Sequence, residues 1–228
     1  MQILQNGGSI TKVLNICYIY VIYIDILIKK YKIVMYIRSF MRVISGKAKG
    51  TKLYSIESKK TRPTLDRVKE SLFNILQNRL QDANVLDLFS GSGAIGIEFL
   101  SRGAKCAYMC DKSYDAIEIA RKNIIKTKLL ENAKLINKDY IKCLEDLKKQ
   151  NIKFDIVFLD PPYETEFAIE ACKKIIQFDL LEKEAIIIIE TDQENREKSK
   201  LKDLDIEVYD CRKYGRVCLI FLRRKELE

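Results

Sequence analysis

Short apolar stretches alternate with amphipathic stretches along most of the 228-residue chain. Five of the apolar stretches have the length of buried strands, namely ANVLDLF, KCAYMCD, AKLIN, FDIVFLD and EAIIIIE. The first four are each followed by apolar residues at helical spacing, and the fifth is followed by a polar helix or loop. Continuous apolar strands that alternate with helices predict a parallel sheet covered by helices on both faces.

Different patterns stand at the two ends of this alternation. IEVYDCRKYGRVCLIFLRR predicts a closing antiparallel hairpin that turns near Gly215. MRVISGKAKGTKLYSI predicts a hairpin of two short strands, and TRPTLDRVKESLFNILQNRL predicts an amphipathic helix. The predicted fold class is α/β: a doubly wound, Rossmann-like, mostly parallel seven-stranded sheet with a C-terminal antiparallel hairpin, plus a small N-terminal β-hairpin and helix.

The first forty residues differ from the rest. They are rich in Ile and Tyr, and Asn15, Asp25 and several lysines interrupt the apolar run. The uninterrupted part is shorter than the roughly 20 residues that a membrane span needs, and no small-residue cleavage site follows it. We interpret residues 1–40 as an atypical extension upstream of a translation start at Met41. A peripheral membrane anchor is the alternative.

Composition excludes several kinds of chemistry. The chain contains no histidine, which rules out Ser-His-Asp hydrolysis, H-E-x-x-H zinc chemistry and a histidine general base. Its seven cysteines form no C-x-x-C pair, and several lie inside apolar runs. This pattern predicts reduced, mostly buried thiols in a cytosolic protein, without a disulfide framework or a zinc site.

The formal net charge of +9 is concentrated near the front of the chain. Residues 41–81 contain ten basic and three acidic side chains, whereas residues 82–228 are close to neutral. A basic front segment on a near-neutral body favours a polyanionic partner that approaches from one side. A solvated, lysine-rich surface without a partner is the alternative interpretation.

A glycine-rich loop follows the first strand of the predicted sheet. Gly91 to Gly96 match G-x-G-x-x-G, and Asp111 ends the second strand about 20 residues further on, as in dinucleotide-binding proteins. The match alone is weak, because any adenosine-containing ligand that needs close approach of the backbone can use such a turn. A nicotinamide-dependent oxidoreductase and an enzyme that uses another adenosine-containing cofactor are therefore both open.

Carboxylates at the strand ends favour S-adenosylmethionine as that cofactor. Asp87 ends the first strand, where it would repel a pyrophosphate but attract the ammonium group of S-adenosylmethionine. Asp111 suits the ribose hydroxyls, and Asp139, after the third strand, suits the adenine amino group. Phe89 and Gly93 belong to the same loop and join this cofactor-binding set. A strand-end Asp is also often only a helix cap or a turn former.

The fourth strand ends in Asp160-Pro161-Pro162-Tyr163. The exocyclic amine of a base is a poor nucleophile because its lone pair is delocalised into the ring. The Asp160 carboxylate and the Pro161 carbonyl, fixed in direction by the two prolines, can accept its two N–H bonds and aim the lone pair at a methyl donor. Asp160 then takes the proton, and Tyr163 offers a flat face to a base rotated out of its stack.

LDLFSGSGAIGIE together with FLDPPY resembles class I S-adenosylmethionine-dependent methyltransferases that act on amino nitrogens. RVISGKAKGTKL and TRPTLDRVKESLFNIL are similar to the front segment of the RsmD family, the bacterial 16S rRNA guanine-N2 methyltransferases. The resemblance extends from Met41 to about Arg224. It implies methylation of one guanine of 16S rRNA, within the small ribosomal subunit or a late assembly intermediate. We therefore expect a cytoplasmic monomer with an RNA-facing segment at 41–81, a catalytic domain at 82–228 and no metal.

The resemblance also implies roles for individual residues. Asp160, Pro161, Pro162 and Tyr163 match the catalytic tetrapeptide, and Asp87, Gly91, Gly93 and Asp111 match cofactor positions. Arg62 and Arg67 match a segment over the mouth of the active site, where we expect them to grip phosphates; Arg67 is as readily explained by pairing with Asp66 or Glu70. The basic hairpin, with Arg42, Lys47 and Lys49, is expected to contact backbone phosphates.

Two further alternatives remain. The D-P-P-Y tetrapeptide is shared with enzymes that methylate adenine N6 in DNA, so it does not choose the base. A non-catalytic RNA-binding protein on a methyltransferase scaffold is also compatible with the sequence.

Overall fold

The computed structural model describes residues 41–55, 64–162 and 165–225, and these belong to one structural unit. Arg62 and Tyr163 lie outside the described residues, as does the predicted extension at residues 1–40. In the described part of the chain, no helix is long and apolar enough to cross a membrane.

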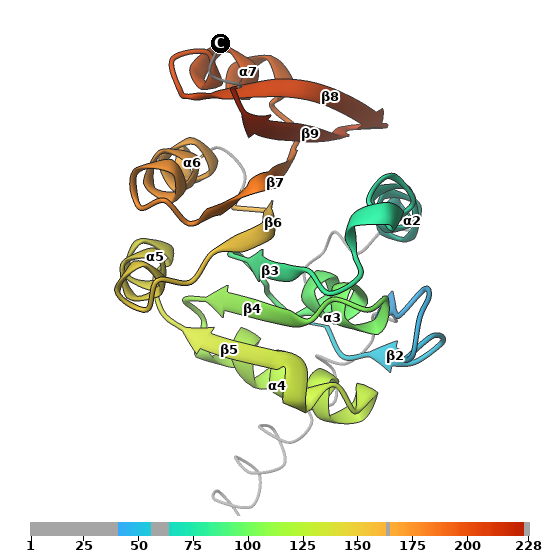
Figure 1. Ribbon diagram of the computed structural model, residues 1–228. Coiled ribbons are helices and arrows are strands. Elements are labelled where there is room, and N and C mark those ends of the chain that lie inside the picture. Colours follow the sequence, from blue (N-terminus) through green and yellow to red (C-terminus); the bar gives the residue numbers. More distant parts are fainter. Residues whose placement is uncertain (1–40, 56–63, 163–164, 226–228) are drawn as a thin grey trace, which may run out of the picture. The chain divides into compact units, whose positions relative to one another are not determined.

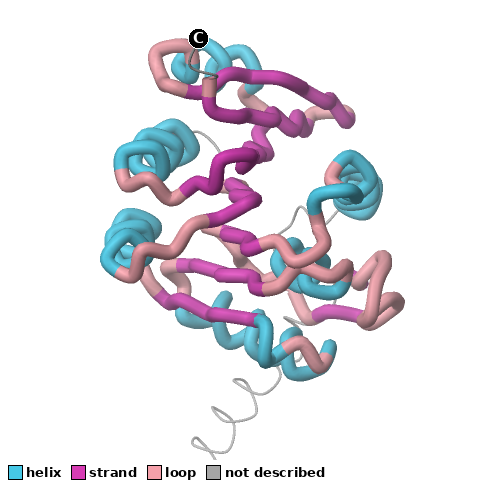
Figure 2. Tube along the Cα trace, in the orientation of Figure 1, coloured by secondary structure: helices cyan, strands magenta, loops and turns pink. Residues whose placement is uncertain are grey.

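A seven-stranded sheet forms the centre of the fold (Figures 1 and 2). Its order is β5-β4-β3-β6-β7-β9-β8, with β3 Asn84–Asp87, β4 Cys106–Asp111, β5 Ala133–Asn137, β6 Phe154–Leu159, β7 Leu181–Thr191, β8 Ile206–Tyr214 and β9 Val217–Arg224. The first five strands are parallel, and β9 runs antiparallel between β7 and β8. The predicted strands, the closing hairpin and its turn at Gly215, where φ is +64°, are confirmed.

Helices cover both faces of the sheet, as the strand–helix alternation predicts. The helices are α2 Thr64–Ile75, α3 Ala94–Ser101, α4 Tyr114–Thr127, α5 Tyr140–Lys149, α6 Phe167–Gln177 and α7 Glu194–Leu201, with short 3-10 turns at Gln77–Arg79 and Leu130–Asn132. Side chains of α2, α3 and α4 share one hydrophobic cluster, and side chains of α5, α6 and α7 share another. The doubly wound α/β fold is confirmed.

The front segment contains a minimal hairpin, β1 Met41–Arg42 and β2 Lys52–Leu53, followed by α2. It is joined to α3 by the buried side chain of Glu98, whose oxygens accept hydrogen bonds from the backbone N–H groups of Ile44 (2.8 Å) and Ser45 (3.0 Å). Glu98 also pairs with Lys69 at 3.1 Å and with Arg102 at 2.8 Å. This carboxylate therefore holds the hairpin and α2 against the body of the protein.

Glycine is required where the front hairpin approaches α3. Gly46 has φ +81°, and a Cβ atom built on it would lie 1.8 Å from the carbonyl oxygen of Ser101. The backbone N–H of Lys47 donates to the same oxygen at 2.7 Å. Only glycine allows this close approach of two backbones.

Candidate active site

The carboxyl ends of β3, β4, β6 and β7 surround a cavity of about 680 Å³. A volume of this size lies within the range of small-molecule sites. Predicted site residues that line it are Asp87, Phe89, Gly91, Asp111, Asp139, Asp160, Pro161 and Pro162. Residues of the front segment, including Lys69 and Leu72, form another part of its wall. The sheet thus brings together residues that are far apart in the sequence.

The glycine loop closes one side of the cavity. Gly91 and Gly93 have φ values of +52° and +77°, so both adopt the left-handed conformation that glycine tolerates best. Gly93 shapes this turn without lining the cavity, and its N–H donates to the carbonyl of Ser90 at 2.8 Å. A Cβ atom on Gly96 would lie 2.5 Å from the side chain of Met109, so the third glycine allows α3 to pack closely on β4.

Asp111 is oriented by two backbone hydrogen bonds. One oxygen accepts from the N–H of Gly91 at 2.9 Å and the other accepts from the N–H of Ser113 at 2.8 Å. Each carboxylate oxygen can accept more than one hydrogen bond, so both remain able to bind hydroxyl groups. This arrangement fits the predicted contact with a ribose.

Asp87 is buried in the floor of the cavity, with 1% of its surface exposed. One oxygen accepts from the N–H of Gly96 at 3.1 Å. Burial raises the pKa of Asp87 from 3.8 to about 8, and the charges of Asp160 and Asp111 add to this effect. No ion pair to Asp87 is found among the described residues. A cationic ligand would therefore be strongly favoured beside it.

Asp160 follows the last residue of β6 and faces the cavity. Its accessible surface opens into the cavity, yet protein atoms surround the carboxyl group closely enough for desolvation to raise its pKa to about 7. Pro161 and Pro162 also line the cavity, and the carbonyl of Pro162 accepts from the hydroxyl of Thr165 at 2.8 Å. The strand tip is thereby tied to the loop that leads into α6.

Glu190 is a fifth acid in the lining of this cavity, and the sequence interpretation missed it. It lies near the end of β7, is 7% exposed and lines the same cavity. Burial, followed by the charges of Asp160 and Asp87, raises the pKa of Glu190 well above its ordinary value. The available signal was the acid that ends EAIIIIE, because FDIVFLD ends in Asp160 in the same way.

Asp139 combines the two roles that the sequence left open. It caps α5 by accepting from the N–H of Ile141 at 3.0 Å, and it also lines the cavity. Beside it, an aromatic row runs from Phe89 to Tyr140, at 5.4 Å between ring centroids, and on to Phe167, at 5.1 Å. Tyr140 and Phe167 line the cavity and were not predicted as site residues.

The predicted RNA-binding residues lie outside the cavity. Lys47, Lys49 and Arg67 are exposed, and none of them lines the cavity. Arg42 is exposed and lies 3.7 Å from Asp66. Asp66 thus has Arg42 as its partner. Among the described residues, no ion pair of Arg67 with Asp66 or Glu70 is found.

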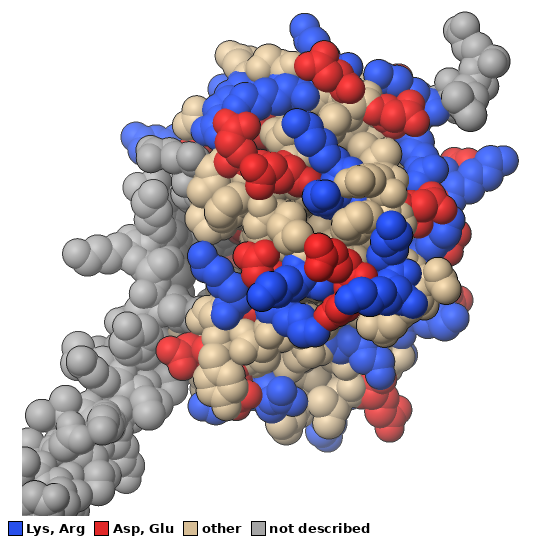
Figure 3. Space-filling view, turned by 90° about the vertical axis from the view of Figure 1, so that its left-hand side faces the viewer, with Lys and Arg blue, Asp and Glu red and all other residues tan. Residues whose placement is uncertain are grey.

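The face formed by α5 and α6 mixes basic and acidic side chains without a large region of one sign (Figure 3). Several of these charges pair with each other, as Lys149 does with Asp146 at 3.4 Å and Lys153 with Asp179 at 2.6 Å.

The fold and the cavity together define a class I methyltransferase, the class whose methyl donor is S-adenosylmethionine. The antiparallel β9, inserted between β7 and β8, distinguishes the sheet from the six parallel strands of a classic dinucleotide-binding fold. A family model described as "Conserved hypothetical protein 95" matches residues 41–223, and the chain belongs to this family, that of the RsmD-like methyltransferases. The family resemblance inferred from the sequence is confirmed.

Individual relatives agree with this assignment. The chain is 37% identical over 154 residues to "Putative rRNA methyltransferase YlbH" of Bacillus subtilis, covering 68% of this chain and 84% of that protein. It is 36% identical over 155 residues to "Ribosomal RNA small subunit methyltransferase D" of Escherichia coli K12, covering 68% and 76%. The solved structure "Putative methyltransferase yhhF from Escherichia coli" is 28% identical, with a TM-score of 0.69 and coverage of 83% and 100%.

Proposed function

We propose that this protein is an S-adenosylmethionine-dependent rRNA methyltransferase that methylates the N2 amine of one guanine in 16S rRNA. The observation that carries the proposal is the meeting of the Asp160-Pro161-Pro162 strand tip with the glycine loop and four further acids in one cavity. Family membership and relatives named as small-subunit rRNA methyltransferases support rRNA as the substrate. The cytoplasm, where ribosomal subunits are assembled, is the corresponding location.

The residues around the cavity fit the proposed cofactor. Asp87 and Asp111 supply acceptors for an ammonium group and for ribose hydroxyls, while Phe89 and Asp139 lie where an adenine ring and its amino group can be held. S-adenosylmethionine supplies an electrophilic methyl group bonded to a sulfonium. The buried carboxyl group of Asp87 has no ion-pair partner among the described residues, so a ligand with positive charge and no phosphate would favour its ionised form and match this site.

The base-binding part of the site follows from the strand tip. The Asp160 carboxylate and the Pro161 carbonyl accept the two N–H bonds of the amine and hold its lone pair toward the methyl group. As the N–C bond forms and the C–S bond breaks, the amine nitrogen becomes positively charged and loses one proton to Asp160. The pKa of Asp160, raised to about 7, suits a group that must accept a proton at neutral pH.

Glu190 completes this part of the proposal as the acid beside Asp160 that stays protonated. Two neighbouring carboxylates in a desolvated site do not both ionise readily, so Glu190 retains its proton while Asp160 carries the negative charge. The isosteric Glu190→Gln variant should therefore keep most of its turnover, whereas Asp160→Asn should lose it. A comparable loss in both variants would show that Glu190 must ionise.

The test is methyl transfer from labelled S-adenosylmethionine to small ribosomal subunits that lack the modification, with duplex DNA in parallel and the product nucleosides identified. N2-methylguanosine from the subunits alone supports the proposal. N6-methyladenine from the DNA would replace it with the adenine alternative. Cofactor binding without transfer to either substrate would favour the non-catalytic RNA-binding protein.

The way in which rRNA is bound is also part of the proposal. The exposed side chains of Arg42, Lys47, Lys49 and Arg67 contact backbone phosphates and set the position of the RNA, while the cavity selects the base. Arg62 is proposed to grip a phosphate over the mouth of the site, and Tyr163 to offer a flat face to the base. The substrate is the small subunit or a late assembly intermediate, and the enzyme acts as a monomer.

A further inference from the structure

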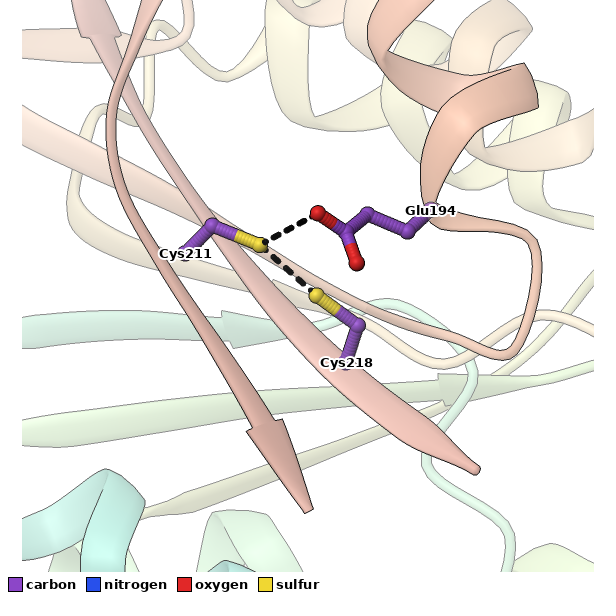
Figure 4. Close-up of side chains that lie close together, drawn as sticks. All are labelled: Glu194, Cys211 and Cys218. Carbon is purple, nitrogen blue, oxygen red and sulfur yellow. Dashed lines mark hydrogen bonds between the residues drawn. The ribbon is translucent and has the colours of Figure 1, made fainter. Parts of the chain in front are cut away.

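Three potential metal ligands meet at the edge of the sheet away from the cavity. Glu194 is the first residue of α7, Cys211 lies on β8 and Cys218 lies on β9. One carboxylate oxygen and the two sulfur atoms all lie within 4.8 Å of one another. Figure 4 shows the three side chains pointing toward a common position. None of the three lines the active-site cavity.

The turn at Gly215 brings the two thiols to the same face of the sheet. Tyr214 pairs with Val217 across this turn, and the same unbroken register places Cys211 opposite Ile220. Residues 218 and 220 of β9 point to the same side, and Cys211 therefore shares a face with Cys218. The register of β8 shifts by one residue only beyond this pair, between Val208 and Asp210. The side chain of Asp210 accepts from the N–H of Cys211 at 2.7 Å.

We propose that Glu194, Cys211 and Cys218 form a binding site for a thiolate-preferring divalent cation such as Zn²⁺, with a solvent molecule as the fourth ligand. Two sulfurs and one carboxylate oxygen are ordinary ligands of tetrahedral zinc. Both thiols lose their protons on binding, so two protons are released to solvent for each cation bound. The sequence predicted no metal site because the two cysteines form no C-x-x-C pair.

The sulfur–oxygen distance, rather than the sulfur–sulfur distance, matches a tetrahedral zinc site. The sulfur of Cys211 lies 2.8 Å from that of Cys218 and 3.4 Å from the carboxylate oxygen of Glu194. Tetrahedral zinc requires about 3.8 Å between two sulfurs and about 3.6 Å between sulfur and oxygen. The sulfur–oxygen distance already fits, and the sulfurs need to separate by about 1 Å. A disulfide would leave Glu194 paired with Lys198 and without contact to a cation at the sulfurs.

One resident cation competes for the same carboxylate. The ammonium of Lys198 donates to the carboxylate oxygen of Glu194 at 2.8 Å, and Lys213 also acts on Glu194 electrostatically. The side chain of Lys198 is 33% exposed and can move into solvent when a metal ion binds. Removing this ammonium should therefore strengthen metal binding.

The test uses the full-length protein, reduced, metal-free and without a histidine tag. Because the chain contains no histidine, no imidazole contributes to the background. Zn²⁺ is titrated in competition with a chromogenic chelator, and Co²⁺ is added separately to detect thiolate-to-cobalt charge-transfer absorption. The expected result is one equivalent of tightly bound Zn²⁺ and a charge-transfer band. No binding, or no such band, would overturn the proposal.

Variants identify the ligands. Cys211→Ser and Cys218→Ser should each weaken Zn²⁺ binding by more than about 100-fold, since even the outer partners of metal ligands contribute about 10–100-fold. Cys106→Ser, on β4, and Cys17→Ser, outside the described residues, are the matched controls and should bind as the parent does. If the control variants lose Zn²⁺ affinity to the same extent, the proposed site is wrong.

Two variants on α7 keep the test decisive if a cysteine variant fails to fold. Glu194→Gln should weaken Zn²⁺ binding at least about tenfold while leaving any disulfide between the cysteines unchanged. Lys198→Met should bind Zn²⁺ several-fold more tightly. If Glu194→Gln leaves the affinity unchanged, the three-ligand site is wrong. These readouts do not depend on methyl transfer, so their failure leaves the proposed function untouched.

Discussion

Two buried carboxylates in this protein, Glu98 and Asp87, have opposite surroundings. Glu98 is fully buried, pairs with Lys69 and Arg102 and accepts two backbone hydrogen bonds. Asp87 is equally buried, but it accepts one backbone hydrogen bond, and its nearest charges are the acids Asp160 and Asp111. A buried charge is tolerated only when it is compensated. The compensated acid holds the fold together, and the uncompensated acid indicates where a cationic ligand belongs.

The largest expected effect concerns Asp160, whose charge acts on the uncompensated Asp87. Asp160→Asn should lower turnover by more than about 1,000-fold, because a group that accepts a proton in the transition state typically contributes about 10²–10⁴-fold. Cofactor affinity, measured by calorimetry, should change by no more than a few-fold. The isosteric Glu190→Gln variant is the control. An Asp160→Asn enzyme with full turnover would rule out the proposed proton acceptor.

Substitution of Glu98, the compensated acid, should change the stability of the protein rather than its turnover. Glu98→Gln leaves the buried ammonium of Lys69 without a counter-charge and should lower the free energy of unfolding by about 3–5 kcal/mol. The control is Glu118→Gln, which breaks a partly exposed pair with Arg121 and should cost less than about 1 kcal/mol. Chemical denaturation measures both. Equal losses of unfolding free energy in the two variants would mean that burial does not determine how much these carboxylates contribute to stability.

Asp87 should show a trade-off between stability and cofactor binding. Its pKa is raised from 3.8 to about 8, so the folded state holds the proton more tightly than the unfolded state does. The stability of the cofactor-free protein therefore falls as pH rises across this interval. Asp87→Asn should remove that loss and raise the melting temperature at pH 8 by several degrees.

Asp87→Asn should also weaken cofactor binding at least about tenfold, since it removes a negative charge beside the proposed ammonium position. Melting curves with and without S-adenosylmethionine at several pH values measure both effects. A variant that is less stable at pH 8, or that binds the cofactor as tightly as the parent, would contradict this interpretation of Asp87.

The two carboxylates also show what the sequence can and cannot reveal. Asp87 and Asp160 were predicted because each ends an apolar strand beside glycines or prolines, and Asp111 because it ends the next strand about 20 residues after the glycine loop. Glu190 ends such a strand too, but no glycine or proline follows it to mark the position. The role of Glu98 was hidden, because its partners Ile44 and Lys69 lie far away in the sequence.

The cluster at the other edge of the sheet was hidden for a related reason. Cys211 and Cys218 share a face because the turn at Gly215 places Cys211 opposite Ile220, and Glu194 reaches them from the start of α7. The hairpin itself was predictable from its two apolar runs and from Gly215. No local pattern in the sequence places Glu194, on a separate helix, beside the two cysteines.

The smallest expected effect concerns charges that are neither buried nor compensated. Lys47 and Lys49 lie in solvent on the front hairpin, and the backbone N–H of Lys47, rather than its side chain, joins the hairpin to α3. Lys47→Glu/Lys49→Glu should therefore weaken RNA binding about tenfold or more at low salt. It should also reduce the slope of log affinity against log salt by about 1 for each phosphate that the variant no longer neutralises. Stability and cofactor affinity should stay unchanged.

Lys142→Glu/Lys173→Glu is the matched control, because it makes the same change of charge on α5 and α6, across the sheet from the front segment. Salt-titrated binding to small ribosomal subunits separates a local effect from a general effect of net charge. If both double variants lose the same affinity, the rRNA senses only the overall positive charge. If the front-segment variant alone loses it, solvated lysines position the rRNA over a cavity whose chemistry depends on buried acids.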